Sequence, residues 1–342
     1  MKALSPIRRA WIYTCLAGLL GPHDAPAAEP RRPEPGRTVS AWYVYSAGAA
    51  ADTFAAVAGV LDEISVAGEP PPAAFVRDCQ ARGLAVYRLL GATNAYKTAD
   101  QRRNTIRDLV ASCTERGFDG LDIDPGILPD QDRAAYSLFV TDLARALHDG
   151  GKRLTFSVYA PVWGPPADPE CWFDARVIAA VADRIRVMCY DMHMAWPEIW
   201  VLRHDPGFGP VSTPAWTRQS LEFWLRHAPR EKLVLGLPAY SNDFVAAPGG
   251  KSRQVYADRP AVPVGRPVET RWLAYEQVHL HRYLDDEGQA HVFYASDARS
   301  TAALLRVADE LGVSGVGFWH FAAVPPDSWT AVRDWKARAA GR

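Results

Sequence analysis

The sequence has no strong excess of charge of either sign and no apolar run long enough to cross a bilayer. Its 342 residues carry 38 Lys and Arg against 39 Asp and Glu, which gives a formal net charge of −1. A domain that binds nucleic acid or an anionic membrane usually carries a basic excess, so neither class of partner is indicated. The apolar stretch Ala10–Leu20 is shorter than the roughly 20 residues that a spanning helix needs, so no stable membrane span is expected.

Cysteine is scarce and forms no metal-binding or redox pattern. The chain has five Cys, none of them in a C-x-x-C pair, so no metal site and no cofactor is expected. Cys79 and Cys113 fall at similar points of two successive predicted helices, Phe75–Arg82 and Thr105–Arg116. Two interpretations of this pair stay open: a disulfide in an oxidising compartment, or two buried free thiols.

The N-terminus has the pattern of a targeting segment. Arg8 and Arg9 precede the apolar stretch Ala10–Leu20, and a small-residue site, Ala25–Ala27, follows it. This order is typical of a secretory signal peptide, which we place at residues 1–28. The protein is therefore expected to be exported, to the periplasm or the outside of the cell, and the alternative is an uncleaved anchor.

After a Pro-rich linker at residues 29–38, short apolar runs alternate with amphipathic helical patterns such as Asp132–His148. Strands that alternate with helices pair in parallel through crossovers. An open doubly wound sheet would need a Gly-rich phosphate-binding turn after its first strand, and Ser46–Asp52 does not supply one. The sequence therefore predicts an α/β fold, a (β/α)₈ TIM barrel, with strands at Val39–Tyr45, Glu63–Val66, Leu84–Leu90, Gly120–Asp124, Arg153–Tyr159, Arg184–Tyr190, Lys232–Leu237 and Gly315–Trp319.

One long segment interrupts this alternation. The barrel is predicted over residues 39–338, and residues 241–297 separate its seventh strand from the following helix. The segment contains two strand-like runs, Glu269–Leu273 and His291–Ala295, among Pro- and Gly-rich loops. We therefore expect a small α+β insertion over the barrel mouth.

Two carboxylates follow each other at the end of the fourth predicted strand. Because side chains of a strand alternate between its two faces, Asp122 and Asp124 lie on the same side. Two carboxylates inside a barrel are costly unless they share a proton, accept hydrogen bonds or meet a cation. The alternative is a structural hydrogen-bond network, but catalytic residues of parallel barrels gather at the carboxyl ends of strands, which favours a site.

Other strand ends carry groups that suit a sugar ligand. The sixth predicted strand ends in Tyr190 and Asp191, which together can orient and polarise an amide carbonyl. The eighth ends in Trp319, an aromatic floor for a sugar-sized pocket. Trp42 and Trp163 are further candidates for contact with a sugar, whereas most of the 12 Trp and 13 Tyr are expected to pack in the core.

These motifs together resemble glycoside hydrolase family 18, which includes chitinases and spore-cortex or peptidoglycan-type hydrolases. The resemblance spans roughly residues 39–335. Its elements are the signature D-G-x-D-x-D-x-E, matched at Asp119, Gly120, Asp122 and Asp124, the motif M-x-Y-D at Met188, Tyr190 and Asp191, and the last two strands at Lys232–Tyr240 and Gly315–Trp319.

The resemblance implies substrate-assisted catalysis, in which the 2-acetamido oxygen of the sugar attacks the anomeric carbon. It implies that Asp124 orients the acetamido group, Asp122 supports Asp124, Tyr190 hydrogen-bonds the acetamido carbonyl and Trp319 lies under the sugar. The final Glu of the signature is the proton donor to the leaving oxygen, and this chain has Gly126 there. General acid catalysis is worth about 10²–10⁴ in rate, so little or no hydrolysis by the family mechanism is expected.

Three interpretations of function follow. The first is a protein that binds N-acetylglucosamine-containing glycans, of chitin or cell-wall type, on a degenerate hydrolase scaffold. The second is an active glycosidase whose acid has moved, with Glu198 as the example, although an exposed loop carboxylate is the plainer interpretation of that residue. The third is a barrel that binds a protein partner and no sugar, with its pocket filled by side chains.

Overall fold

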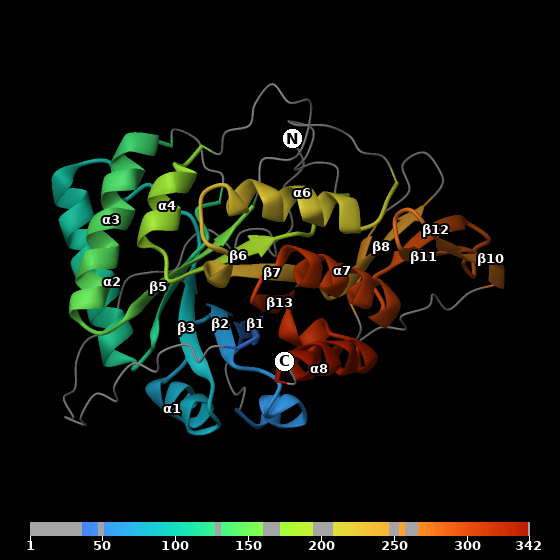
Figure 1. Ribbon diagram of the computed structural model, residues 1–342, viewed down its shortest axis with the longest axis horizontal. Helices are drawn as coiled ribbons and strands as arrows, with labels where there is room; N and C mark the ends of the chain where they lie inside the picture. The colour runs from blue at the N-terminus through green and yellow to red at the C-terminus, as the bar shows by residue number, and fades with distance from the viewer. Residues whose placement is uncertain are drawn as a thin grey trace.

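The computed structural model describes residues 36–46, 51–126, 131–159, 172–193, 208–245, 253–256 and 266–340. Eight parallel strands close into a barrel in the order β1-β13-β7-β6-β5-β4-β3-β2, and helices surround it (Figure 1). The strands are β1 (Thr38–Tyr45), β2 (Glu63–Gly68), β3 (Ala85–Leu90), β4 (Gly120–Ile123), β5 (Arg153–Val158), β6 (Arg184–Met188), β7 (Leu233–Pro238) and β13 (Gly315–Trp319). The predicted TIM barrel is confirmed, and all eight predicted strands lie within two residues of the observed ones.

The helices alternate with the strands as predicted, and the N-termini of several are capped by side chains. Thr98 and Gln101 form a reciprocal capping box at the start of one helix, and Asp132 caps the next through Ala135 N at 2.9 Å. Each cap satisfies a backbone N–H that has no partner inside its helix. The helices are α1 (Ala73–Ala81), α2 (Ala99–Glu115), α3 (Arg133–Asp149), α4 (Ala175–Val181), α6 (Pro214–Leu225), α7 (Ala298–Leu311) and α8 (Pro326–Ala340), with short 3₁₀ turns η2 (Ala51–Val57), η3 (Arg230–Lys232) and η4 (Phe321–Ala323).

Three aspartates tie neighbouring strands together at the amino-terminal end of the barrel. Each precedes an even-numbered strand and accepts a hydrogen bond from a backbone N–H of the strand before it. The pairs are Asp62 with Val39 N, Asp119 with Val86 N, and Asp183 with Leu154 N, each at 2.8 Å. Asp119, the first residue of the fourth-strand signature, therefore staples β3 to β4 at the end of the barrel opposite the candidate site.

The insertion between β7 and α7 contains a five-stranded antiparallel sheet in the order β10-β11-β12-β8-β9, which projects to the side of the barrel (Figure 1). Both predicted runs in this segment are strands. The other three strands were not predicted, and no helix lies among the residues described between β7 and α7. The strands are β8 (Tyr240–Val245), β9 (Arg253–Tyr256), β10 (Arg266–Leu273), β11 (Val278–Leu284) and β12 (Ala290–Ala295).

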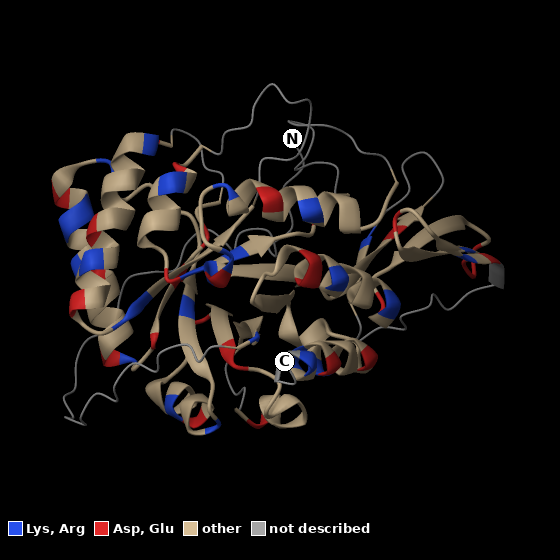
Figure 2. Ribbon diagram, in the orientation of Figure 1, with Lys and Arg blue, Asp and Glu red and all other residues tan. Residues whose placement is uncertain are grey.

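Some of the sequence-based predictions fall on residues that the structure describes, and others fall outside them. Cys79 and Cys113 are buried free thiols, so the disulfide interpretation is wrong. The signal peptide at residues 1–28, Trp163 and Glu198 lie outside the described residues, and their predicted roles stay predictions. Of the helices that the structure describes, none is long and apolar enough to cross a membrane. Basic and acidic segments alternate over the helices in the view of Figure 2.

Candidate active site

The predicted strand-end residues come together at one end of the barrel. Asp124 follows β4, Tyr190 and Asp191 follow β6, and Trp319 ends β13. The ring of Trp42, from β1, lies edge-on to Tyr190 at 6.1 Å and to Trp319 at 6.2 Å between centroids. The ends of β6 and β13 therefore meet at the Trp42 ring, and Asp124 lies close enough to Tyr190 for its charge to raise the pKa of that residue.

Asp122 is the deepest residue of this group. Its side chain has no exposed surface. Oδ2 accepts hydrogen bonds from Ser65 at 2.7 Å and Ser157 at 2.8 Å, and Oδ1 accepts one from Thr155 at 2.9 Å. Asp122 therefore lies inside the barrel with both carboxylate oxygens hydrogen-bonded, and its role in supporting Asp124 stays a prediction.

Asp124 lies above it at the mouth and is partly exposed. Its Oδ1 accepts the backbone N–H of Gly126 at 2.9 Å. Burial raises the pKa of Asp124 to about 6, the Gly126 hydrogen bond lowers it in part, and the nearby Asp122 charge raises it. Asp124 therefore changes its charge near neutral pH, where a carboxyl group at a surface would stay ionised.

The raised pKa of Asp124 predicts that the stability of the folded protein depends on pH. A carboxyl group whose pKa is higher in the folded than in the unfolded state stabilises the fold at low pH, and this contribution is lost as pH rises through the folded pKa of about 6. Asp124→Asn keeps the acceptor for Gly126 N and removes the charge. We expect the variant to melt a few degrees higher than wild type at pH 7.5 and at the same temperature at pH 4, as measured by calorimetry. Equal melting temperatures at both pH values would contradict the shift.

Asp191 is held at the other side of Tyr190. It adopts a left-handed backbone conformation, with φ of 65°, and its Oδ1 accepts a hydrogen bond from the Tyr240 hydroxyl at the start of β8. Burial raises the pKa of Asp191 to about 6, and the Tyr240 hydrogen bond opposes that rise. Gly236 on β7 makes room for this arrangement, because a Cβ there would lie 2.6 Å from Val187 O and 3.2 Å from the Tyr190 ring.

Tyr190 itself is buried, but no hydrogen bond engages its hydroxyl among the residues that the structure describes. Burial raises the pKa of Tyr190 well above its usual value, and the carboxylates of Asp191 and Asp124 add to the rise. The hydroxyl therefore stays protonated at neutral pH and is available as a hydrogen-bond donor.

The two candidate Trp residues that the structure describes differ in accessibility. Trp319 is partly exposed, so its ring can offer a face to a ligand. Trp42 is 1% exposed, and its Nε1 donates to Ser157 Oγ at 2.8 Å. The prediction that Trp42 contacts a sugar is therefore not supported, because the ring lies beneath Tyr190 and Trp319 and packs against them.

Gly126 occupies the position where the family resemblance implies a catalytic Glu. Its φ is 51°, and a Cβ built there would lie 2.8 Å from Ala92 Cβ. Its N–H donates to Asp124, and its carbonyl accepts a hydrogen bond from Trp172 Nε1 at 2.6 Å. The backbone is therefore fixed on both sides in a conformation that L-residues with side chains rarely adopt.

Sequence reasoning missed Tyr240 as a partner of Asp191 and Trp172 as a partner of Gly126. Tyr240 closes the segment Lys232–Tyr240 that carries part of the family likeness, which is the signal that could have found it. No signal in the sequence marks Trp172. Among the described residues, no cluster of His, Cys, Asp and Glu is placed to hold a metal ion.

Residues 88–323 match the model of the glycosyl hydrolases family 18, which is more than half of the chain. The chain belongs to glycosyl hydrolase family 18. The eight-stranded barrel described above is therefore a family-18 barrel.

Known proteins of two kinds resemble this family-18 chain. The cortical fragment-lytic enzyme of Bacillus subtilis is 23% identical over 245 residues, which cover 68% of this chain and 53% of that protein. A chitinase from Chromobacterium violaceum has a similar structure, with a TM-score of 0.72, 23% identity, and coverage of 88% of this chain and 99% of the chitinase. The spore cortex-lytic enzyme SleL of Bacillus megaterium gives a TM-score of 0.69 at 17% identity, over 88% of this chain and 75% of SleL. The chain spans about half the length of the curated relatives it matches.

Proposed function

We propose that this protein binds N-acetylglucosamine-containing glycans, of chitin or cell-wall type, at the carboxyl end of its barrel, and hydrolyses them weakly or not at all by the family mechanism. The observation that carries the proposal is the convergence of Asp124, Tyr190 and Trp319 beside a glycine at the position of the acid. The names of the similar proteins, a chitinase, a cortical fragment-lytic enzyme and a spore cortex-lytic enzyme, support the choice of polymer.

Each retained group has a partner on an N-acetylated sugar. The partly exposed Trp319 ring suits stacking against the apolar face of a pyranose. The Tyr190 hydroxyl can donate to the acetamido carbonyl. Asp124 Oδ2 has no partner among the described residues, so it can accept the acetamido N–H. A sugar without the acetamido group would leave the Asp124 and Tyr190 groups without partners, which is a strong basis for discrimination.

With glycine at position 126, only the step in which the leaving oxygen receives a proton lacks its residue. Departure of the leaving alkoxide without a general acid costs about 10²–10⁴ in rate. Its N–H and carbonyl are engaged with Asp124 and Trp172, so the segment after β4 takes part in holding Asp124 instead of delivering a carboxyl group. Binding is thus retained while efficient turnover is lost.

Binding is tested with chito-oligosaccharides. We expect N-acetylglucosamine oligomers to raise the melting temperature of the wild type, and Asp124→Ala or Tyr190→Phe to weaken binding about tenfold, the size of one lost hydrogen bond to a polar ligand group. Calorimetric titration measures the dissociation constants. Tyr275→Phe is the matched control, because Tyr275 is 81% exposed and no contact joins it to the site. Absence of stabilisation by any glycan in a broad panel would defeat the proposal.

We further propose that the protein is exported, on the basis of the charged, apolar and small-residue pattern of residues 1–28. Sequencing the N-terminus of the protein recovered from its native cells tests this, since export predicts a chain that begins near residue 28. An intact N-terminus on a cytoplasmic protein would exclude it.

A further inference from the structure

One buried hydroxyl group near the candidate active site has no hydrogen-bond partner. It belongs to Tyr136, the fourth residue of α3, which is 3% exposed. Its hydroxyl forms no hydrogen bond with the residues that the structure describes. Buried polar groups of proteins are nearly always hydrogen-bonded, because an unpaired one has lost its contacts with water and gained none. The Tyr136 hydroxyl therefore points to a group that the protein binds.

Tyr136 lies at the mouth of the barrel, next to the segment that carries Gly126. In a parallel barrel the helix after a strand begins at the carboxyl end of that strand, so the start of α3 lies at the level of the site. The Tyr136 ring packs on that of Trp172, with 4.7 Å between centroids, and Trp172 Nε1 donates to Gly126 O at 2.6 Å. Gly126 N in turn donates to Asp124 Oδ1 at 2.9 Å. A series of contacts therefore connects Tyr136 to Asp124.

The charge of Asp124 also reaches Tyr136. Burial raises the pKa of Tyr136 well above its usual value, and the Asp124 carboxylate adds more to this rise than any other charge. The hydroxyl is therefore protonated at neutral pH and has a proton to donate. No hydrogen bond joins the two side chains directly. A third group between them would satisfy the Tyr136 hydroxyl.

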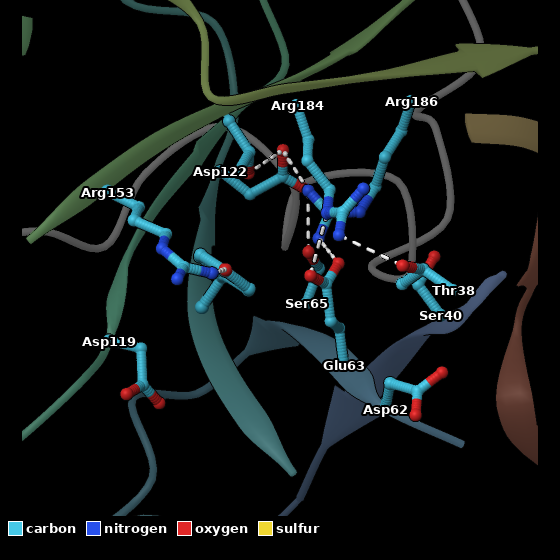
Figure 3. Close-up of polar contacts among 12 residues, drawn as sticks. Thr38, Ser40, Asp62, Glu63, Ser65, Asp119, Asp122, Arg153, Arg184 and Arg186 are labelled. Carbon is cyan, nitrogen blue, oxygen red and sulfur yellow. Dashed lines mark hydrogen bonds and ion pairs between the residues drawn. The ribbon is translucent and has the colours of Figure 1, made fainter. Parts of the chain in front are cut away.

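The other carboxylate of the site, Asp122, already has its partners. Figure 3 shows it in a buried ionic network of charged side chains inside the barrel. The members of this network are Glu63 on β2, Asp122 on β4, and Arg184 and Arg186 on β6. Both oxygens of Asp122 also accept hydrogen bonds from hydroxyl groups of neighbouring strands. Asp122 therefore needs no further group.

Asp124 differs from Asp122 in this respect. Its Oδ1 accepts the N–H of Gly126, but its Oδ2 has no partner among the described residues. A group that joins Asp124 Oδ2 to the Tyr136 hydroxyl has to donate one hydrogen bond and accept another. An amide N–H only donates and a carbonyl only accepts, whereas a hydroxyl does both.

We propose that Tyr136 is a further ligand-binding residue of the candidate site, and that its hydroxyl and Asp124 together hold one hydroxyl oxygen beside Gly126. This oxygen belongs either to a sugar or to a water molecule. The sugar form deepens the proposed function and rests on it, whereas the water form does not. Asp124 Oδ2 can accept an acetamido N–H and this hydroxyl at once, because a carboxylate oxygen has more than one lone pair.

The sugar form is tested with Tyr136→Phe, which removes the hydroxyl and keeps the ring. The test is made at pH 7.5, where Asp124, with a pKa of about 6, is mostly ionised. We expect the variant to bind the N-acetylglucosamine trimer about five- to tenfold more weakly than the wild type, the size of one lost hydrogen bond to a polar ligand group. Calorimetric titration measures the dissociation constants.

Tyr96→Phe is the matched control. Tyr96 is also fully buried, and its ring lies 5.3 Å from that of Tyr136 between centroids. Asp124 is not among the charges that act on Tyr96. The affinity of this variant for the trimer should therefore stay within about twofold of the wild-type value, since no ligand hydrogen bond is lost.

The water form is tested without sugar. If a bound water joins the two side chains, Tyr136→Phe lowers the melting temperature by about 2–4 °C through the loss of one hydrogen bond. A hydroxyl that binds nothing gives the opposite sign, because its removal relieves a buried unpaired group. Calorimetry of the sugar-free protein measures the difference.

A double-mutant cycle tests whether Asp124 shares the bound oxygen. Asp124→Asn replaces Oδ2 by an amide, whose N–H donates and cannot accept the proton of the shared hydroxyl. Tyr136→Phe should therefore cost less affinity, or a smaller shift in melting temperature, in the Asn background than in the wild type. A Tyr136 that only packs would give the same loss in both backgrounds.

Two results overturn the proposal. One is a Tyr136→Phe protein with the affinity of the wild type and an equal or higher melting temperature, and the other is a loss of the same size in both backgrounds. Absence of glycan binding by the wild type would defeat the proposed function and the sugar form alone. The sugar-free melting temperatures would then decide between a bound water and a hydroxyl that binds nothing.

Discussion

Gly126→Glu is expected to leave the protein without a hydrolase activity of family-18 size and to destabilise it. A Glu at position 126 would match the family signature. The backbone of this residue, however, has a φ of 51°, and a Cβ built there would lie only 2.8 Å from Ala92 Cβ. A left-handed conformation costs a side-chain-bearing residue about 1–2 kcal/mol, and overpacking adds about 1–3 kcal/mol. The melting temperature should fall by about 5–10 °C.

Relaxation of the backbone to a negative φ would not restore the acid without further loss. The N–H of Gly126 holds Asp124, and its carbonyl holds Trp172, so a rotation that suits Glu breaks one or both contacts. We therefore expect cleavage of chitin oligomers and of peptidoglycan to rise less than about tenfold in the variant, against the factor of 10²–10⁴ that a working general acid supplies.

Three companion proteins make the Gly126→Glu experiment decisive. Gly126→Ala carries the strain without the carboxyl group and should lose nearly as much stability. The double variant Ala92→Gly with Gly126→Glu removes the colliding methyl group and should recover part of that loss. Gly91→Ala is the control, because nothing lies within 4 Å of a Cβ there. Strong cleavage by Gly126→Glu alone would mean that the segment after β4 can still deliver an acid, and robust cleavage by the wild type would mean that the acid lies elsewhere.

The barrel could be predicted from the sequence because its signals are local. Runs such as Arg153–Tyr159 are short, rich in β-branched and aromatic residues and alternate with amphipathic helices, and a closed parallel barrel accommodates all eight of them at once. The strand-end residues Asp124, Tyr190 and Trp319 followed from the same logic, since the carboxyl ends of parallel strands meet at one mouth.

The conformation of Gly126 could not be predicted. A glycine in the sequence can adopt many φ values, and the sequence does not show that the Ala92 methyl group lies beside it. The accessibility of Trp42 was also beyond the sequence: its ring sits under two others that come from strands β6 and β13. Both features depend on contacts between segments far apart in the chain, which local patterns do not encode.

The buried ionic network carries a signal that sequence reasoning left unused. Arg184 and Arg186 alternate with Ile185 and Val187 in a strand whose first four residues are all buried, so both arginines point to one side and need anionic partners there. Glu63 and Asp122 occupy inward positions on β2 and β4 and supply them. Which arginine pairs with which carboxylate depends on three-dimensional geometry.

The last prediction concerns the glycine of the same signature. Gly120 begins β4, and a Cβ built there would lie 2.1 Å from the backbone oxygen of Arg153 and 2.8 Å from its carbonyl carbon. Backbone atoms of a paired strand cannot move aside as a side chain can, so Gly120→Ala must push β4 and β5 apart at the point where Gly120 faces Arg153. We expect a loss of more than about 3 kcal/mol in the free energy of unfolding, the range of severe overpacking, measured by urea denaturation.

A loss of this size would show that the signature needs a glycine at position 120 for packing. The Gly120 residue itself does not contact the candidate site, so its substitution acts on the site only by moving β4. Asp122 lies on β4 and Asp124 directly follows it, so displacement of β4 from β5 separates Asp122 from Thr155 and Ser157. Gly120→Ala should therefore lose glycan binding along with stability, whereas the Gly91→Ala control should keep both. A Gly120→Ala protein with the urea midpoint of the wild type would show that the β4–β5 pair has room for a methyl group, and with it that the signature keeps this glycine for a reason other than the close approach of two strands.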